Sequence, residues 1–518
     1  MMKKWMSLLL VALLTYSITA VPVQAGKPTN PNTGGVPGSW TEGTAPDRID
    51  PSKPAILFVH GLNSSASVWY ENNDMYEKFH SNGYQTAFIN LYDITGTSQS
   101  MWDNGRLLSD KIKEISKHFG KKLIIVAHSK GGVDTQAAIV HYGAAPYVQR
   151  VLTLGSPHHG SQLADLAYSS WAGWLAELIG SQSPGTASVQ TSYMKSFRSQ
   201  TDGLSASKAV PFYTLAGNNW SSGSTSHFLG GLYLSSFGDN DGVVTVQNSY
   251  LPHARMISVG SWNHSTVRTG SHVYSLLSPY LQQKEPAQLS SSSFTYDQSA
   301  IHSSASPSSS SFFIRGGKHD GQASQTLMIE DGVDTVKLDW INDQPLKNLE
   351  LMRPDGSIKS VQLDVYQDYE VFRGAWHHTA VLQQPEPGTY QLTASTSDAG
   401  AYLMVAQFNR VEDFKISLKS SGSEIKLQQQ GQASVTDVTY SVYYYGNSGG
   451  SSASQLLSPS LSDKVHTSSS GLTLSTISQP GIYSITIETE GITEKGFPYR
   501  RTIVQSLYVD KDGRQFGL

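Results

Sequence analysis

Six short apolar segments, separated by stretches with helical spacing, constrain the fold of the first half of the chain. Short strands that are apolar throughout are typical of parallel sheets, because helices cover both faces of such sheets. We therefore predict a doubly wound, mostly parallel α/β sheet. The expected strands are Ala55–Val59, Tyr84–Leu91, Lys122–Val126, Arg150–Leu154, Val210–Leu215 and Arg255–Val259, and the expected helices include Leu107–His118 and Val133–Tyr142.

Changes in composition divide the chain of 518 residues into further regions. The first residues have the pattern of an export signal, because Lys3 and Lys4 precede a short apolar core and Val23–Ala25 provides a small-residue cleavage site. We therefore expect a secreted, extracellular protein. The predicted regions are a signal peptide (1–25), a flexible lead-in (26–50), an α/β domain (51–285) with a cap region at about 162–207, and a Ser-rich linker (286–311).

The C-terminal half has the pattern of β-rich domains. Segments such as Thr335–Trp340 alternate between apolar and polar residues. Pro387–Tyr390 (sequence PGTY) and Pro480–Tyr483 (sequence PGIY) begin 93 residues apart, about the length of one β-sandwich. The Gly-x-Tyr within each segment resembles the tyrosine corner of immunoglobulin-like sandwiches. We predict two such sandwiches, at 312–415 and 416–518.

Cysteine content and charge exclude several classes of function. The chain has no cysteine, which excludes disulfides and thiolate metal sites. Its formal net charge is -4, which is small for this length. Because nothing indicates a surface that binds polyanions, we expect no nucleic-acid partner.

Ser129 has the sequence context of a nucleophile. The segment Ala127–Gly132 (sequence AHSKGG) follows an apolar strand and opens a helix, as the G-x-S-x-G elbow requires. Small residues must flank the serine because the turn is tight. Gly131 meets this demand, and Ala127 replaces the first glycine. We predict that the turn holds the Ser129 hydroxyl clear of the sheet.

A serine nucleophile needs a base, and the base needs an orienting carboxylate. In α/β-hydrolases the carboxylate and then the histidine follow the serine along the chain. Asp241 lies in a loop downstream of the fifth strand, and His264 follows the sixth strand, so we predict these two residues. The alternatives are Asp239 for the carboxylate, and for the base His253, which precedes the strand, or His272, expected on the next helix.

Backbone N–H groups are the expected donors to the developing oxyanion. One belongs to Lys130, directly after the nucleophile, and the other is expected in the loop after the first apolar strand. His60-Gly61-Leu62 stands in that loop, so the sequence predicts Leu62 as the second donor.

With these motifs the sequence resembles the secreted lipases of Gram-positive bacteria, within the α/β-hydrolase superfamily. The resemblance covers roughly residues 51–283 and implies that Ser129, Asp241 and His264 form the catalytic triad. It also implies hydrolysis of acylglycerols or simpler esters, without an organic cofactor. Some relatives carry structural zinc or calcium, but their ligand sets have no match here, so we predict no metal. The motifs are His60-Gly61, the Ala-containing elbow, Asn240–Gly242 (NDG) and Gly155–Gly160 (GSPHHG).

The cap region carries an apolar helical face. We consider two interpretations, an ordinary core helix and a cap whose tryptophans face the substrate. We expect His158 and His159 to shape the loop and the acyl-pocket wall, with metal binding as the alternative. The apolar face comprises Leu163, Leu166, Ala167, Trp171, Trp174, Leu175 and Leu178.

Two alternatives to ester hydrolysis stay open. The same triad could transfer the acyl group to an alcohol or cleave a polyester. The C-terminal half could instead bind a surface or the cell wall, since Tyr440–Tyr445 places tyrosines on both faces of a strand. Packing within a sandwich is the other interpretation of these tyrosines.

Overall fold

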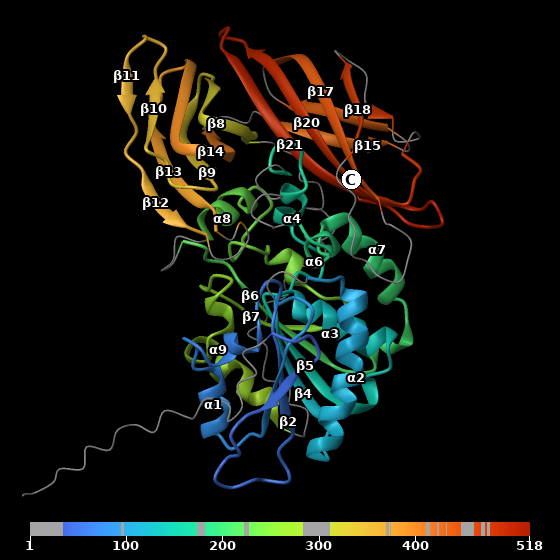
Figure 1. The fold of residues 1–518 in the computed structure, drawn as a ribbon. Coiled ribbons are helices and arrows are strands. Elements are labelled where there is room, and N and C mark those ends of the chain that lie inside the picture. Colours follow the sequence, from blue (N-terminus) through green and yellow to red (C-terminus); the bar gives the residue numbers. More distant parts are fainter. Residues whose placement is uncertain are drawn as a thin grey trace, which may run out of the picture.

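The computed structural model has a parallel sheet with flanking helices at one end and antiparallel β-sheets at the other (Figure 1). The predicted signal peptide, the first part of the lead-in (26–34) and nearly all of the linker lie outside the described residues. No helix in the described part of the chain is long and apolar enough to cross a membrane. The structure describes residues 35–94, 98–173, 182–221, 227–282, 311–368, 372, 374–410, 415–421, 424–430, 433–446, 460–467, 472–473 and 477–517.

Seven described strands form the first sheet, in the order β1-β3-β2-β4-β5-β6-β7. β1 pairs antiparallel with β3, and the other neighbours pair in parallel. The predicted α/β-hydrolase fold with a mostly parallel sheet is therefore confirmed. The strands are β1 (Trp40–Glu42), β2 (Ala55–Val59), β3 (Thr86–Ile89), β4 (Leu123–His128), β5 (Val148–Leu154), β6 (Phe212–Gly217) and β7 (Arg255–Gly260).

Helices cover both faces of this sheet because its strands are apolar on both faces. Alternate residues of β2 enter opposite cores, Leu57 on one side and Phe58 on the other. Helices α2 (Met101–Phe119) and α3 (Lys130–His141) fill the Leu57 side, and α1 (Met75–Ser81) and α9 (Gly270–Leu277) fill the Phe58 side. α2 starts at a Ser100 side-chain cap and ends at Gly120, whose φ of 65° is left-handed.

Four short helices lie between the parallel sheet and the C-terminal sheets (Figure 1). They are α4 (Gln162–Ala167), α6 (Pro184–Ser188), α7 (Thr191–Thr201) and α8 (Phe228–Leu234). The prediction of one apolar helical face continuing past Ala167 is wrong, because α4 ends there and the Ser170 N–H donates to Thr486 Oγ1 at 3.3 Å. Trp174, Leu175 and Leu178 lie outside the described residues.

The first C-terminal sheet is one continuous antiparallel sheet folded over its own core. Its longest strand, β14, pairs with β10 near its start and with β9 near its end, and an irregularity in register lies between Ser395 and Ala399. Apolar residues from both halves, such as Leu392 and Trp340, form the core between them. The strands are β8 (Phe312–Ile329), β9 (Val333–Asn342), β10 (Asn348–Met352), β11 (Ile358–Ser360), β12 (Asp364–Gln367), β13 (Trp376–Gln383) and β14 (Gly388–Arg410).

The remaining strands form two further antiparallel sheets, in the orders β15-β16-β19 and β18-β17-β20-β21-β22. The antiparallel β architecture predicted for the C-terminal half is thus present, and the boundary at 415/416 stays a prediction. The strands are β15 (Lys415–Ser421), β16 (Glu424–Gln430), β17 (Ala433–Gly446), β18 (Ser460–Thr467), β19 (Leu472–Thr473), β20 (Gly481–Thr493), β21 (Pro498–Val509) and β22 (Gln515–Gly517).

The two Gly-x-Tyr segments have the same local structure. The Tyr390 hydroxyl donates to the Glu386 carbonyl at 2.8 Å, and the Tyr483 hydroxyl donates to the Gln479 carbonyl at 2.9 Å. Each tyrosine therefore reaches back four residues and closes the turn before a long strand, as a tyrosine corner does. The similarity that the sequence suggested is reproduced in space.

Candidate active site

Ser129 occupies a strained turn between β4 and α3. Its φ of 53° and ψ of −135° are unfavourable for a residue with a Cβ, and such strain gathers at functional sites. Glycine is required nearby, because a Cβ on Gly131 would lie 2.3 Å from the His60 carbonyl oxygen. A Cβ on Gly61 would lie 2.6 Å from that of Ser129. The chain therefore forms a tight turn at Ser129, and the close approach of the neighbouring backbone leaves room only for glycine at these two positions.

Ser129, His264 and Asp241 form one hydrogen-bonded chain. The distance from Ser129 Oγ to His264 Nε2 is 3.0 Å, and that from His264 Nδ1 to Asp241 Oδ2 is 2.7 Å. The other carboxylate oxygen of Asp241 accepts the N–H groups of Val243 and Val244 at 2.9 and 2.7 Å. In addition, the His264 N–H donates to the Asp241 carbonyl at 2.8 Å. Both oxygens of the Asp241 carboxylate are therefore hydrogen-bonded, so the carboxylate can orient the imidazole with Nδ1 protonated and Nε2 facing the serine.

The alternative residues lie elsewhere. Asp239 is exposed, although it is only two residues from Asp241. His253 is exposed before β7, and His272 is exposed on α9, where the sequence placed it. The structure therefore brings Asp241 and His264, and not their competitors, to Ser129.

An apolar pocket opens beside Ser129. Its volume is about 80 Å³, and its wall includes Leu62, Lys130 and His264, so both predicted oxyanion donors belong to residues that line it. Ser129 and His264 are only 9 % and 3 % exposed, so both side chains are largely shielded from solvent. The pocket is lined by Leu62, Asn63, Ser129, Lys130, Pro157, Ser161, Leu163, Ala164, Ala167, Thr186, Val189, Val243, Val244 and His264.

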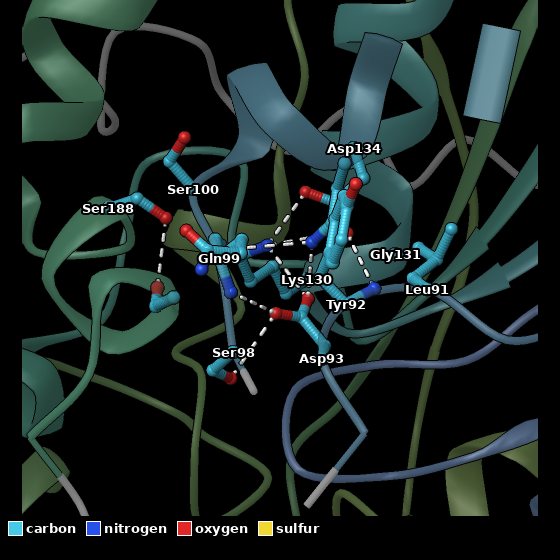
Figure 2. A network of polar contacts seen from close by, with 12 residues as sticks. Leu91, Tyr92, Asp93, Ser98, Gln99, Ser100, Lys130, Gly131, Asp134 and Ser188 are labelled. Carbon is cyan, nitrogen blue, oxygen red and sulfur yellow. Dashed lines mark hydrogen bonds and ion pairs between the residues drawn. The ribbon is translucent and has the colours of Figure 1, made fainter. Parts of the chain in front are cut away.

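The side chain of Lys130 is buried beneath the elbow, between two carboxylates (Figure 2). Lys130 Nζ donates to Asp93 Oδ2 at 2.7 Å and to Asp134 Oδ1 at 2.9 Å. Burial alone would lower the pKa of Lys130, but the two carboxylates raise it, so the ammonium stays charged. Burial also raises the pKa of Asp134 well above its usual range. The sequence motifs indicated a role only for the backbone of Lys130, and this network was not predicted. A lysine on an otherwise buried helix was the available signal, because it demands a partner.

Comparisons with known proteins show which family the chain belongs to. The Bacillus licheniformis lipase BlEst2 in its propeptide form is 33 % identical, with a TM-score of 0.76, over 93 % of this chain and 100 % of the lipase chain. The chain belongs to the α/β-hydrolase family of this lipase. The mature form of BlEst2 is 47 % identical over 48 % of this chain and all of its own, with a TM-score of 0.45. A domain of unknown function, DUF7379, matches residues 33–188. The search of curated proteins found no match.

Membership of this lipase family makes the chain a hydrolase of the lipase and esterase group. The metagenomic carboxyl esterase MGS0156 is also similar, at 19 % identity over 42 % of this chain and 66 % of its own, with a TM-score of 0.33.

Two further histidines of this chain, His128 and His158, lie near the candidate active site. His128, inside the elbow, is buried, and its Nε2 donates to the His264 carbonyl at 2.8 Å. Burial lowers the pKa of His128 well below its usual range, so this ring is a neutral donor that holds the His264 backbone. This role of His128 was not predicted from the sequence. A histidine next to the nucleophile, on a buried strand, was its signal.

The loop after β5 contributes to the pocket through Pro157. His158 is buried beside it, with Nε2 3.2 Å from Thr153 Oγ1, and burial lowers its pKa well below the usual range. Trp171 packs against Arg315 instead of lining the pocket, so the tryptophan-facing cap is wrong for this residue. Among the described residues, no group of three or more His, Asp or Glu side chains is placed to hold a metal ion.

Proposed function

We propose that the chain is a secreted serine hydrolase that cleaves carboxylic esters of lipids, with Ser129 as nucleophile, His264 as base and Asp241 as orienting acid. The hydrogen-bonded chain of these three side chains at the wall of an apolar pocket carries the proposal. The export pattern of the first 25 residues is the basis for secretion.

The geometry supports an acyl-enzyme mechanism. His264 Nε2 takes the proton of the Ser129 hydroxyl as Oγ attacks the ester carbonyl carbon. Asp241 stabilises the imidazolium that forms, through its bond to Nδ1. The backbone N–H groups of Leu62 and Lys130 bind the oxyanion of the tetrahedral intermediate. His264 then gives its proton to the leaving alcohol, and afterwards activates the water that releases the acid.

The pocket favours an apolar acyl group. Most of its lining side chains are aliphatic, and its two basic residues lie at the reacting end, where Lys130 presents its backbone and His264 its ring. Aliphatic walls bind methylene groups at about 0.8 kcal/mol per buried group. An acylglycerol or a simpler fatty ester therefore fits better than a polar acyl group.

A series of p-nitrophenyl esters, from acetate to palmitate, tests the reaction and its acyl preference. We expect the purified full-length chain to release acid from at least part of the series, and Ser129→Ala to release none above background while keeping its circular dichroism spectrum. Turnover by Ser129→Ala equal to that of the wild type would rule out the proposed nucleophile.

Acyl transfer and polyester cleavage would use the same residues. Transfer requires that an alcohol outcompetes water for the acyl-enzyme, and the low exposure of Ser129 and His264 keeps this possibility open. Product analysis with and without added glycerol distinguishes hydrolysis, which releases the acyl group as free acid, from transfer, which releases it as a new glycerol ester; the leaving alcohol forms in both reactions.

We further propose that the C-terminal sheets hold the cap in its closed position. α4 and α6 contribute Leu163 and Thr186 to the pocket wall. α4 also contacts β21 of the C-terminal sheets, and the segment after α4 makes further contacts with these sheets. The Tyr445 hydroxyl donates to the Tyr168 carbonyl at 3.0 Å, and the two rings meet edge to face at 4.8 Å. The guanidinium of Arg315 lies 4.7 Å from the ring centre of Trp171.

The cap and the C-terminal sheets also share one hydrophobic core. Moving the cap away would expose this core to water, which opposes opening. The shared core includes Leu163, Leu166, Ala167 and Tyr168 of the cap with Phe312, Ile314, Tyr445, Ile482 and Val504 of the C-terminal sheets.

Binding to a surface or to the cell wall is a separate proposal for the C-terminal half. Tyr440 is buried in a C-terminal core, Tyr445 is buried against the cap, and the Tyr444 hydroxyl donates to the Pro480 carbonyl at 2.9 Å. The tyrosines that suggested surface binding are thus engaged within the molecule. A pull-down of the full-length chain on cell wall, polysaccharide and lipid vesicles tests the proposal, and retention on none would count against it.

A further inference from the structure

We infer that Asp93 is a positioning residue for the oxyanion-binding site. Its main chain bonds the loop that carries Leu62, and its side chain bonds Lys130, so that it joins the two predicted oxyanion donors. This inference rests on the proposed function, since it concerns the same ester-cleaving site. Asp93 touches neither the pocket nor the serine, so its effect must pass through other residues.

The main chain of Asp93 holds the loop that carries Leu62. The Ser64 N–H donates to the Asp93 carbonyl at 3.2 Å, two residues after Leu62. Just before Leu62, the His60 ring accepts the Leu91 N–H at Nε2, at 2.9 Å, and its Nδ1 lies 2.8 Å from the Gly61 carbonyl. These bonds on either side of Leu62 fasten its loop to the segment that ends in Asp93.

The side chain of Asp93 holds the residue after the nucleophile. Its Oδ2 accepts hydrogen bonds from Lys130 Nζ at 2.7 Å (Figure 2) and from the side-chain amide of Asn104 at 2.9 Å. Its Oδ1 accepts the Gln99 N–H at 3.2 Å. Asp93 and Lys130 are 0 % and 1 % exposed, so water cannot replace these bonds. The ammonium therefore ties the first residue of α3, which carries one predicted oxyanion donor, to the segment that fixes the other.

An oxyanion site depends on this kind of fixation. Its donors must point to where the negative charge develops in the transition state, and they act little on the ground-state carbonyl. A displacement of about 1 Å costs on the order of 100-fold in rate. A loose connection between Leu62 and Lys130 should consequently lower kcat and leave KM nearly unchanged.

Asp134 differs from Asp93 in its place in the network. It bonds Lys130 from within α3, four residues along, and within the described part of the chain it has no hydrogen bond to the Leu62 loop. Burial raises its pKa, so it can become neutral when the lysine is absent. This property allows the lysine and Asp93 charges to be removed together without leaving a charged group alone in the interior.

The test compares Asp93→Asn, Lys130→Met and the double variant in the full-length chain, with p-nitrophenyl butyrate as substrate. We expect each single variant to lose about 10- to 100-fold in kcat per folded molecule, with KM within about twofold, and to have a lowered Tm. In the double variant, Tm should recover toward the wild-type value because no unpaired charge remains, whereas kcat should stay low. Arg150→Met removes a buried cation that bonds the Tyr280 carbonyl at the opposite end of the sheet, and should lower Tm without lowering kcat.

A kcat for Asp93→Asn equal to that of the wild type would overturn the inference, as would a kcat that recovers together with Tm in the double variant. Wild-type protein without activity on any ester would instead contradict the proposed function. The two failures are therefore distinguishable within one experiment.

Discussion

Replacing His264 by alanine is expected to lower kcat for ester cleavage by on the order of 10⁵- to 10⁶-fold, which is close to the loss expected for Ser129→Ala. The serine hydroxyl 3.0 Å from Nε2 would then have no base. Asp241→Asn should cost about 10⁴-fold, because an amide cannot hold the imidazole in the required tautomer. The combination of Ser129→Ala with His264→Ala should be no slower than either single variant, since the residues act as a unit. Initial rates with purified protein measure all four.

Two residues of the same types serve as matched controls. His272→Ala changes an exposed histidine on α9, and Asp239→Asn changes an exposed carboxylate two residues from Asp241. Both should keep kcat within about twofold of the wild type, because neither bonds the serine or the imidazole. A large loss in either control, with retention of activity in His264→Ala, would mean that the catalytic base has been misassigned.

Separating the C-terminal sheets from the rest of the chain is expected to raise hydrolysis of long-chain esters by about 10- to 100-fold. A cap that is open in only about 1–10 % of molecules lowers the apparent activity to about that fraction of the value for an open cap, and separation would remove the restraint. A site-specific protease sequence inserted within the predicted linker (286–311) allows the cut, followed by gel filtration to part the fragments. Activity on a palmitate ester, before and after the cut, is the readout.

Point variants examine the same restraint in the uncut chain. Tyr445→Ala removes the ring and the hydroxyl that contact Tyr168, and should raise long-chain activity in the same direction by a smaller factor. Ile358→Ala truncates an exposed side chain on β11 and should change nothing. Equal or lower palmitate hydrolysis by the separated catalytic part, with its fold intact, would contradict a closing role for the C-terminal half.

The parts of the fold that follow local rules were predictable from the sequence. The strands of the parallel sheet are short apolar runs, and each predicted strand overlaps an observed one. The nucleophile elbow is equally local, because the contact between Gly131 and the His60 carbonyl leaves no room for a Cβ. Chain order then restricted the search for the acid and the base to a few downstream residues, among which Asp241 and His264 reach the serine.

The parts that depend on distant contacts were not predictable in the same way. Asp93 and Lys130 are 37 residues apart, and a buried ion pair leaves no periodic pattern that links its members. α4 ends at Ala167, and the Ser170 N–H after it donates to Thr486 on a C-terminal strand instead of to a helix carbonyl. A contact over this distance in the chain leaves no local pattern in the sequence. Likewise, the alternating pattern of β14 predicts a strand, but not that one sheet would bend over its own core.

Covalent labelling with a small fluorophosphonate tests the central claim most directly, because this probe reacts with a serine only when a base and an oxyanion site activate it. The measurement is the intact mass of the full-length chain, followed by peptide mapping of the adduct. The account predicts one adduct per molecule, located on Ser129, and none in Ser129→Ala or His264→Ala. An active protein that stays unlabelled, or that carries its adduct on another residue, would contradict it.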